Sequence, residues 1–204
     1  NSDHGGISIL TPNDKVGLIY FGDPGDDNAG QVFYDHDNER LGFAVESTNR
    51  MFLDANSRIS LSNNDASGAV GTTLFGYNAG LSIASGSVEN TFIGHAVSDA
   101  TMTDAADYNT GVGAFSLSAL TAGTQNTAIG AYALSTNSSG VYNTAVGVEA
   151  LTNNSDDKNT AVGTQAGYLT TGADNTYVGF SAGKGASGAE ADNVAVGSNA
   201  LLAV

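Results

Sequence analysis

The side chains best suited to bind a cation lie in two acidic clusters within the first forty residues. Asp35, Asp37 and Glu39 alternate along the chain like the first ligands of a calcium-binding loop, and a second cluster spans residues 23 to 27. The calcium-loop template also requires a central glycine and a terminal glutamate at fixed offsets, and neither cluster meets both requirements. We therefore expect solvated turns and no cofactor, with a weak Ca2+ site at Asp35, Asp37 and Glu39 as the alternative.

No group of residues in the sequence indicates catalysis. His4, His36 and His95 are too scattered for a ligand set, and none belongs to a recognisable nucleophile motif. Carboxylate pairs for glycoside hydrolysis lie about 5 to 9 Å apart in space and need not be close in sequence, so polysaccharide depolymerisation stays open as an alternative. The repeats described below hold few carboxylates, with only Glu149 inside a motif, and thin repetitive coils offer no cleft. We therefore predict that the protein is not an enzyme.

Six tyrosines are better candidates for function, as contacts to a receptor. They fall in variable columns or return loops of a repeat, where a side chain is expected to point outward: Tyr77, Tyr108, Tyr132, Tyr142, Tyr168 and Tyr177. Aromatic faces suit sugar rings, and contacts repeated along a multivalent particle can raise avidity by about 10² to 10⁴. The alternative is that several of these rings only shield neighbouring coils.

These tyrosines belong to an array of eight short repeats, each anchored on a glycine. The anchors are Gly76, Gly94, Gly113, Gly130, Gly147, Gly163, Gly179 and Gly197. Asparagine stands four positions before the glycine and threonine three positions before it in seven of the eight repeats. The residue directly before the glycine is always apolar: Phe75, Ile93, Val112, Ile129, Val146, Val162, Val178 and Val196. Eight aligned repeats do not arise by chance, so residues 72 to 204 form a repeat array, and we expect this apolar column to be its core.

A repeat as short as the one from Gly147 to Gly163 predicts a β-solenoid. The unit is too short for paired helices, and its Gly, Thr, Val and Asn content opposes helix. We expect two short strands and two turns per coil, with the glycine at positive φ and coils stacked about 4.8 Å apart. Burying one Val contributes about 1.5 to 3 kcal/mol, whereas ordering each residue costs about 1 to 2 kcal/mol. So thin a coil is not expected to stand alone, and we predict that three copies pack around a common axis.

The repeated Asn-Thr-x-Val/Ile-Gly-x-x-Ala pattern resembles the head repeat of YadA-like trimeric adhesins, which also occurs in phage tail fibres. The resemblance covers about 130 of the 204 residues. It implies a left-handed parallel β-roll and a homotrimeric fibre. The longest units, such as the one from Gly94 to Gly113, exceed the adhesin unit in length, and position 111 is Gly where Ala is usual.

Residues 1 to 62 carry larger apolar runs separated by Gly, Asp and Asn, which read as strands and turns. We expect strands at residues 7 to 10, 16 to 22, 30 to 35, 40 to 45 and 50 to 61, and a hairpin whose tip is residues 36 to 39. The order of these runs resembles shaft segments that precede an endosialidase-type intramolecular chaperone in phage tail fibres. Residues 63 to 71 are then the junction to the repeats.

The resemblance implies a structural and receptor-binding fibre of a bacteriophage virion, which contacts other tail proteins and a host polysaccharide or outer-membrane receptor. A bacterial trimeric surface adhesin is the alternative, and a depolymerising tailspike is the second alternative. The net charge of −15 argues against nucleic acid as a partner, since phosphate recognition relies on Lys and Arg. No apolar run is long enough to cross a bilayer as a helix, so no membrane-spanning segment is expected. Bacterial surfaces are also anionic, so attachment needs either screening by salt or bridging by divalent cations.

Overall fold

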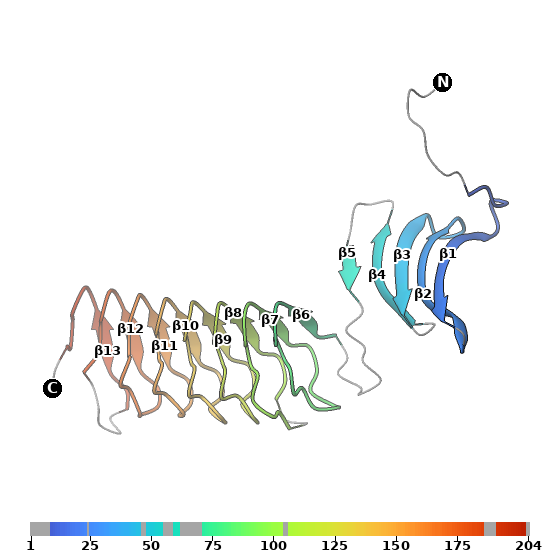
Figure 1. The fold of residues 1–204 in the computed structure, drawn as a ribbon. Coiled ribbons are helices and arrows are strands. Elements are labelled where there is room, and N and C mark those ends of the chain that lie inside the picture. Colours follow the sequence, from blue (N-terminus) through green and yellow to red (C-terminus); the bar gives the residue numbers. More distant parts are fainter. Residues whose placement is uncertain are drawn as a thin grey trace. The chain divides into compact units, whose positions relative to one another are not determined.

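The computed structural model describes residues 9–23, 25–45, 48–54, 59–61, 71–103, 106–185 and 191–202. The chain divides into two compact units, Asn1–Ser62 and Asn63–Val204, and each unit is described here by itself. Across these described ranges every helix or strand element is a strand, with five in the first unit and eight in the second (Figure 1). The prediction of an all-β protein is therefore confirmed. Apart from Gly71, the predicted junction at 63 to 71 lies outside the described residues.

The first unit is a single antiparallel sheet in which each strand pairs with the next one along the chain. Its strands are β1 (Val16–Asp23), β2 (Asp26–Asp35), β3 (Arg40–Val45), β4 (Thr48–Asp54) and β5 (Ile59–Leu61). Residues 36 to 39 connect β2 to β3, whose pairing ends at Asp35 and Arg40. The strand predicted at 7 to 10 is not seen in the part of it that the structure describes, because Ile9 and Leu10 lie outside any strand. Residues 7 and 8 are not described.

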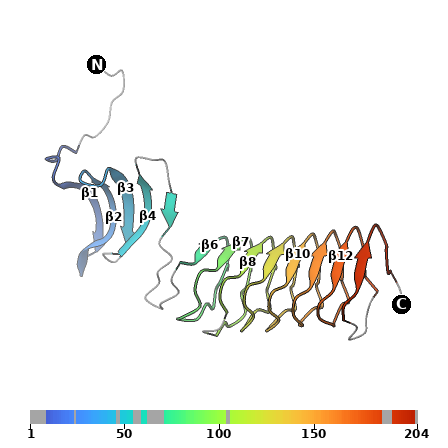
Figure 2. The same cartoon turned by 180° about the vertical axis from the view of Figure 1, so that it is seen from behind.

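The second unit is a parallel β-solenoid, as the repeat length predicted (Figures 1 and 2). Its strands are β6 (Thr73–Phe75), β7 (Thr91–Ile93), β8 (Thr110–Val112), β9 (Thr127–Ile129), β10 (Thr144–Val146), β11 (Thr160–Val162), β12 (Thr176–Val178) and β13 (Val194–Val196). Neighbouring strands pair motif to motif, so that Thr144 faces Thr160 and Val146 faces Val162. Eight strands delimit seven turns, which at about 4.8 Å per strand spacing extend over about 34 Å.

Each described coil contains one strand, where two were expected. The chain after the anchor glycine bends through left-handed positions instead of extending: after Gly147, the residues Glu149, Leu151 and Lys158 have φ of 58°, 48° and 58°. The anchor must be glycine for two reasons. Gly147 has φ of 137°, and a Cβ there would lie 2.5 Å from the carbonyl group of Gly163 in the next coil. The anchors thus let successive coils approach closely.

The predicted core column faces outward, which corrects the expectation from the sequence. Phe75, Ile93, Val112, Ile129, Val146, Val162, Val178 and Val196 are exposed or half-buried, whereas the central residue of each strand from β7 to β13 is buried. In a three-residue strand the first and third side chains share one face and the second takes the other. Alternation shows which residues share a face, but it does not show which face is inside. The strand centre is the inward position, and Ala128, Ala145 and Ala161 occupy it with no exposed area because buried leucines after the turn take up the rest of the interior in these coils.

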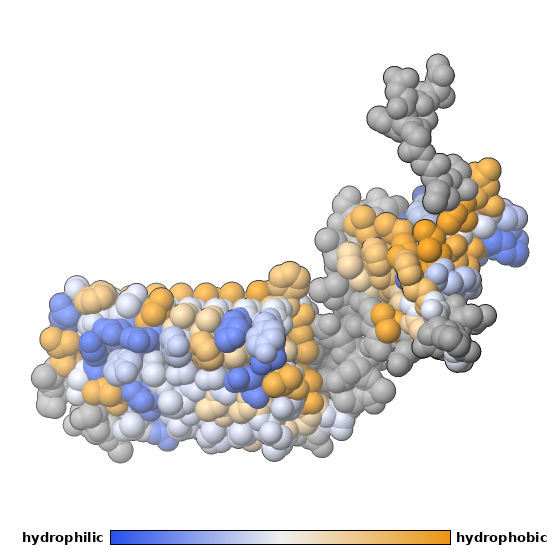
Figure 3. Space-filling view, viewed as in Figure 1, coloured by the Kyte–Doolittle hydropathy of each residue, from blue (hydrophilic) through white to orange (hydrophobic). Residues whose placement is uncertain are grey.

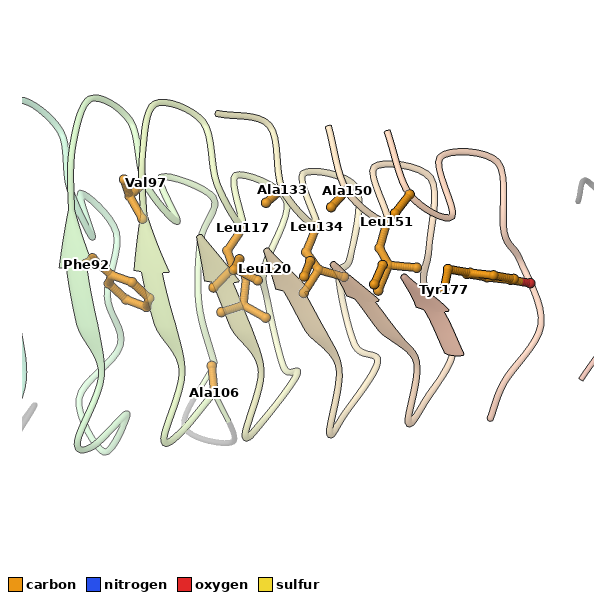
Figure 4. Packing of buried hydrophobic residues seen from close by; sticks show 14 of the residues in the cluster. Phe92, Val97, Ala106, Leu117, Leu120, Ala133, Leu134, Ala150, Leu151 and Tyr177 are labelled. Atoms are coloured by element: carbon orange, nitrogen blue, oxygen red, sulfur yellow. The ribbon is translucent and has the colours of Figure 1, made fainter. Parts of the chain in front are cut away.

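The interior is filled by pairing large residues with small ones from different columns (Figure 4). In the middle coils, alanines at the strand centre lie beside buried leucines after the turn, namely Leu117, Leu134 and Leu151. Where the strand centre carries the large ring of Tyr177, the leucine positions become Gly167 and Gly183. A Cβ on Gly167 would lie 2.9 Å from the Tyr177 ring, and one on Gly183 would also contact it, so these glycines make room for the ring. The core volume per coil is conserved by this exchange.

A ladder of buried asparagine side chains joins the coils. The Oδ1 atom of each asparagine accepts a hydrogen bond from the backbone N–H of the asparagine in the next coil, as from Asn126 to Asn109 at 3.0 Å. The Asn126 side-chain amide also donates to Asn109 Oδ1 and to the Gly140 carbonyl. The ladder runs through Asn90, Asn109, Asn126, Asn143, Asn159, Asn175 and Asn193. Only asparagine supplies an acceptor and two donors on so short a stem, which explains its recurrence.

The corrected interior predicts that Ala145→Asp destroys the solenoid. Ala145 has no exposed area, so the substitution buries an unpaired carboxylate at a cost of several kcal/mol. Circular dichroism should show loss of cooperative thermal unfolding. Ser139→Asp is the matched control, because Ser139 is exposed in the same coil and receives the same charge. Unchanged melting of Ala145→Asp would show that this face of the strand is not interior.

Candidate functional site

Stacked rings form a ladder along one outward line of the first coils. The ring centroids of Tyr77 and His95 lie 5.5 Å apart and those of Phe115 and Tyr132 lie 5.1 Å apart, and both pairs are nearly parallel. His95 and Phe115 meet edge to face at 5.0 Å. The coil spacing of about 4.8 Å lies within the range of aromatic pairing, and each such pair contributes about 0.5 to 1.5 kcal/mol. Tyr77 and Tyr132, which were predicted to contact a receptor, therefore each pack one face of the ring against a neighbouring ring.

Polar side chains continue this line in the later coils. Glu149 Oε2 accepts a hydrogen bond of 2.7 Å from Gln165 Nε2, and Gln165 Oε1 accepts one of 2.7 Å from Lys184 Nζ. The Lys184 ammonium also lies 5.9 Å from the ring centroid of Tyr168. Glu149 is thus held in a hydrogen-bonded chain that ends on a cation, which makes it a poor candidate for acid–base work.

Tyr108 and Tyr142 are the tyrosines best placed for a ligand. Both are exposed, by 53% and 54%, at the left-handed position that precedes the ladder asparagine. Gln125 occupies the same position in the coil between them and is also exposed. Two coil spacings place the tyrosines about 10 Å apart with the amide between them. No ring contact within the described residues covers either ring, so this Tyr–Gln–Tyr group offers two aromatic faces and an amide.

The other two predicted tyrosines differ in exposure. Tyr168 is half-buried and lies near the Lys184 ammonium. Tyr177 has no exposed area, since it is the central residue of β12 and points into the solenoid (Figure 4). The prediction of Tyr177 as an outward receptor contact is wrong, because its strand position falls on the inward face.

The outward side of the eight strands forms one continuous surface, which we call the outer strand face. It consists of the first and third residues of β6 to β13, which are Thr or Val in the first column and Phe, Ile or Val in the second. In the second column the exposed fraction runs from 37% for Ile93 to 70% for Val196 among the exposed members. Neither column contains a charged residue, although the chain carries 6 Lys and Arg and 21 Asp and Glu.

The acidic turn between β2 and β3 is organised around Asp35. Asp35 Oδ2 accepts 2.9 Å hydrogen bonds from the Asn38 amide and from Arg40 Nε, and the Arg40 guanidinium completes an ion pair. The Asn38 hydrogen bond, followed by Arg40, lowers the pKa of Asp35 below its ordinary value of 3.8 against the opposing effect of burial. The other Ca2+ candidates, Asp37 and Glu39, are exposed. In the described part of the chain no three potential metal-ligating side chains come together, and the Asp35 carboxylate already holds a cation partner.

Comparison with known protein families, with curated proteins and with solved structures finds no match to this chain. Function is therefore argued from the geometry of the two units. No helix in the described residues has the length and apolar character needed to cross a membrane.

Three residues that define these surfaces were not predicted from the sequence. His95 and Phe115 complete the stacked ladder, and Gln125 completes the Tyr–Gln–Tyr group. Their positions in the repeat could have identified them. Gln125, for example, stands one residue before its asparagine, as Tyr108 and Tyr142 do. Aligning every column, including the variable ones, finds this group.

The Asp35 geometry predicts an acid-sensitive hairpin. A carboxyl whose pKa is lowered by folding stabilises the fold above its unfolded pKa and loses that effect as the pH falls through the folded pKa. Asp35→Asn should therefore reduce hydrogen-exchange protection of residues 26 to 45 at neutral pH. Below pH 3.8 the protection of the unaltered chain should fall towards that of the variant. Asp37→Asn is the control from the same turn, and an equal loss in both variants would contradict the role of Asp35.

Proposed function

We propose that this chain is a structural and receptor-binding segment of a homotrimeric fibre, and specifically of a bacteriophage tail fibre that attaches to a host surface. The observation that carries the proposal is the outer strand face. All-parallel sheets occur almost only where both faces are covered. Here one face covers the solenoid interior, while the other presents uncharged Thr, Val, Ile and Phe side chains to solvent.

A second solenoid of the same kind is the best cover for this face. The side chains recur once per coil, at about 4.8 Å, over eight strands. Another copy of the chain has side chains at the same spacing, so the two surfaces can pack along their whole length. A surface without this spacing would contact the face only at scattered points. Branched Val and Ile side chains lose little rotamer freedom on burial, which favours their use at such an interface. The resemblance to YadA-like heads supports three copies around one axis.

The Tyr–Gln–Tyr group supports attachment to a surface polysaccharide. The two half-exposed tyrosine rings can pack against the apolar faces of sugar rings, and the Gln125 amide can donate to and accept from hydroxyl groups. A trimer presents the group three times, and repeated weak contacts raise avidity. The trimer also carries three times −15, which is −45, so nucleic acid is not the expected partner.

A bacterial trimeric surface adhesin is the alternative, since it would use the same face and the same rings. Depolymerisation of the polysaccharide has less support, because two of the carboxylates near the Tyr–Gln–Tyr group already accept backbone hydrogen bonds. Asp107 Oδ1 accepts from the Val88 backbone at 2.8 Å, and Asp157 Oδ1 accepts from the Val141 backbone at 2.9 Å.

The oligomer is tested by mass. Sedimentation equilibrium should give about 61 kDa, which is three times 20.5 kDa. Val146→Asp places like charges together on the outer strand face and should abolish this mass, because each copy brings its own carboxylate to the interface. Ser139→Asp adds the same charge at an exposed turn of the coil and should leave the mass unchanged. A stable folded monomer of the unaltered chain would overturn the proposal.

Attachment is tested by retention on immobilised bacterial surface polysaccharide. The amount of protein retained on the polysaccharide should be at least about tenfold lower for the double variant Tyr108→Ala, Tyr142→Ala, since multivalency amplifies the loss of each ring. The control is Tyr77→Ala, which removes a ring from the stacked ladder. Retention by the unaltered chain should rise with salt from about 10 mM, because the Debye length of about 30 Å shrinks to about 3 Å at 1 M.

Two further outcomes separate the alternatives. Loss of retention at high salt after chelation would show that divalent cations bridge the two surfaces. Shortening of the polysaccharide during incubation would favour the depolymerase. Equal retention by the double variant and the unaltered chain would exclude the Tyr–Gln–Tyr group as the contact.

A further inference from the structure

One face of the N-terminal sheet is built from large apolar side chains that remain uncovered within the described residues. Register and alternation place nine of them on the same side, and we call this set the apolar sheet face: Ile19, Phe21, Val32, Tyr34, Leu41, Phe43, Val45, Met51 and Leu53. One row runs straight across four strands, as Ile19 pairs with Val32, Val32 with Phe43, and Phe43 with Met51. Figure 3 shows apolar residues gathered over this unit.

Exposure on β3 is the reverse of that expected for a half-buried strand. Leu41, Phe43 and Val45 are exposed, by 37%, 39% and 51%, while the alternate residues Gly42 and Ala44 are buried. The buried side results from Phe33, whose ring lies over Gly42 and leaves no room for a side chain there. Strand β3 thus buries its small residues and presents its large ones.

The apolar sheet face also has a hollow that could receive side chains from a facing surface. It measures about 270 Å³ and is lined mainly by Ile9, Ile19, Val32, Tyr34 and Leu41. Tyr34 and His36 also line the hollow, and their rings meet edge to face at 4.9 Å. The nine side chains of the face include no charge, which does not suit an ionic ligand.

A sheet of this kind requires a second layer. Stable domains bury a sheet face against another element, and a single sheet layer does not supply a core. The second layer must be present whenever the unit is folded, and the partner that is always available at equal concentration is the chain itself. A copy carries the same uncharged face, so two such faces meet without burying an unpaired charge.

We infer that the apolar sheet face is a second interface between copies of this chain, separate from the outer strand face of the solenoid. The inference rests on the proposed function, because copies already joined through their solenoids hold these faces at an effective concentration in the millimolar range. The sheets then pack face to face, with large side chains of one copy entering the hollow of another. Each chain contributes two surfaces to one assembly.

The chain contains no cysteine, so a single introduced thiol reports on one position. Phe43→Cys and Leu53→Cys place the thiol on the apolar sheet face, and Tyr20→Cys places it on the opposite face, where Tyr20 is 53% exposed. In the intact assembly, alkylation at positions 43 and 53 should be at least about tenfold slower than at position 20. All three thiols should react equally in denaturant. Using two positions guards against one variant that fails to fold.

A pyrene group on each thiol identifies what covers the face. Because every chain carries one label, excimer emission arises only between copies, and it is expected at positions 43 and 53 but not at 20. Protection without excimer emission would show that another part of the same chain or a different molecule is the cover, and it would overturn the inference. A trimer by mass with rapid alkylation at positions 43 and 53 would overturn the inference and leave the proposed fibre standing. A monomer by mass would overturn both.

Discussion

The strand spacing of about 4.8 Å between coils is the constraint on which the repeat array depends. Inter-coil contacts recur at this interval, so a residue that recurs in a buried column must satisfy a like neighbour above and below. The asparagine ladder meets this demand with hydrogen bonds, as between Asn126 and Asn109, and the anchor glycines meet it by leaving room for backbone contact. The stacked rings of Phe115 and Tyr132 meet it because aromatic pairing distances match the spacing.

The same constraint explains why function is expected on the outside. Strand-centre residues and buried side chains from the turns fill the interior of the described coils, with alanine and leucine in the middle coils and tyrosine and glycine near β12. What varies freely is the outward columns, and these carry the rings of Tyr108 and Tyr142. A regular scaffold of this kind fixes the spacing of its surface groups without a specialised pocket.

Both units of the chain present an uncharged sheet face to solvent. The outer strand face belongs to a parallel sheet and the apolar sheet face to an antiparallel one, and each lacks a cover in the described part of the chain. With a charge of −15, the rest of the surface repels other copies. We therefore expect the proposed association to use the two faces that carry no charge, since burial of apolar area there is not opposed by like-charge repulsion.

The sequence by itself determined the solenoid, because eight aligned repeats of so short a period permit only short stacked units. It also identified the glycines with positive φ and the threonine and valine positions that share a strand face. It did not determine which face is inside. Val146 is more apolar than Ala145, yet Ala145 is the buried one, because the space within the coil is limited by Leu134 and Leu151 from other columns. Tyr177 was misplaced for the same reason: its room in the core comes from Gly167 and Gly183, which lie elsewhere in the repeat. Burial depends on the volume that distant segments leave free, and only the tertiary structure brings those segments together.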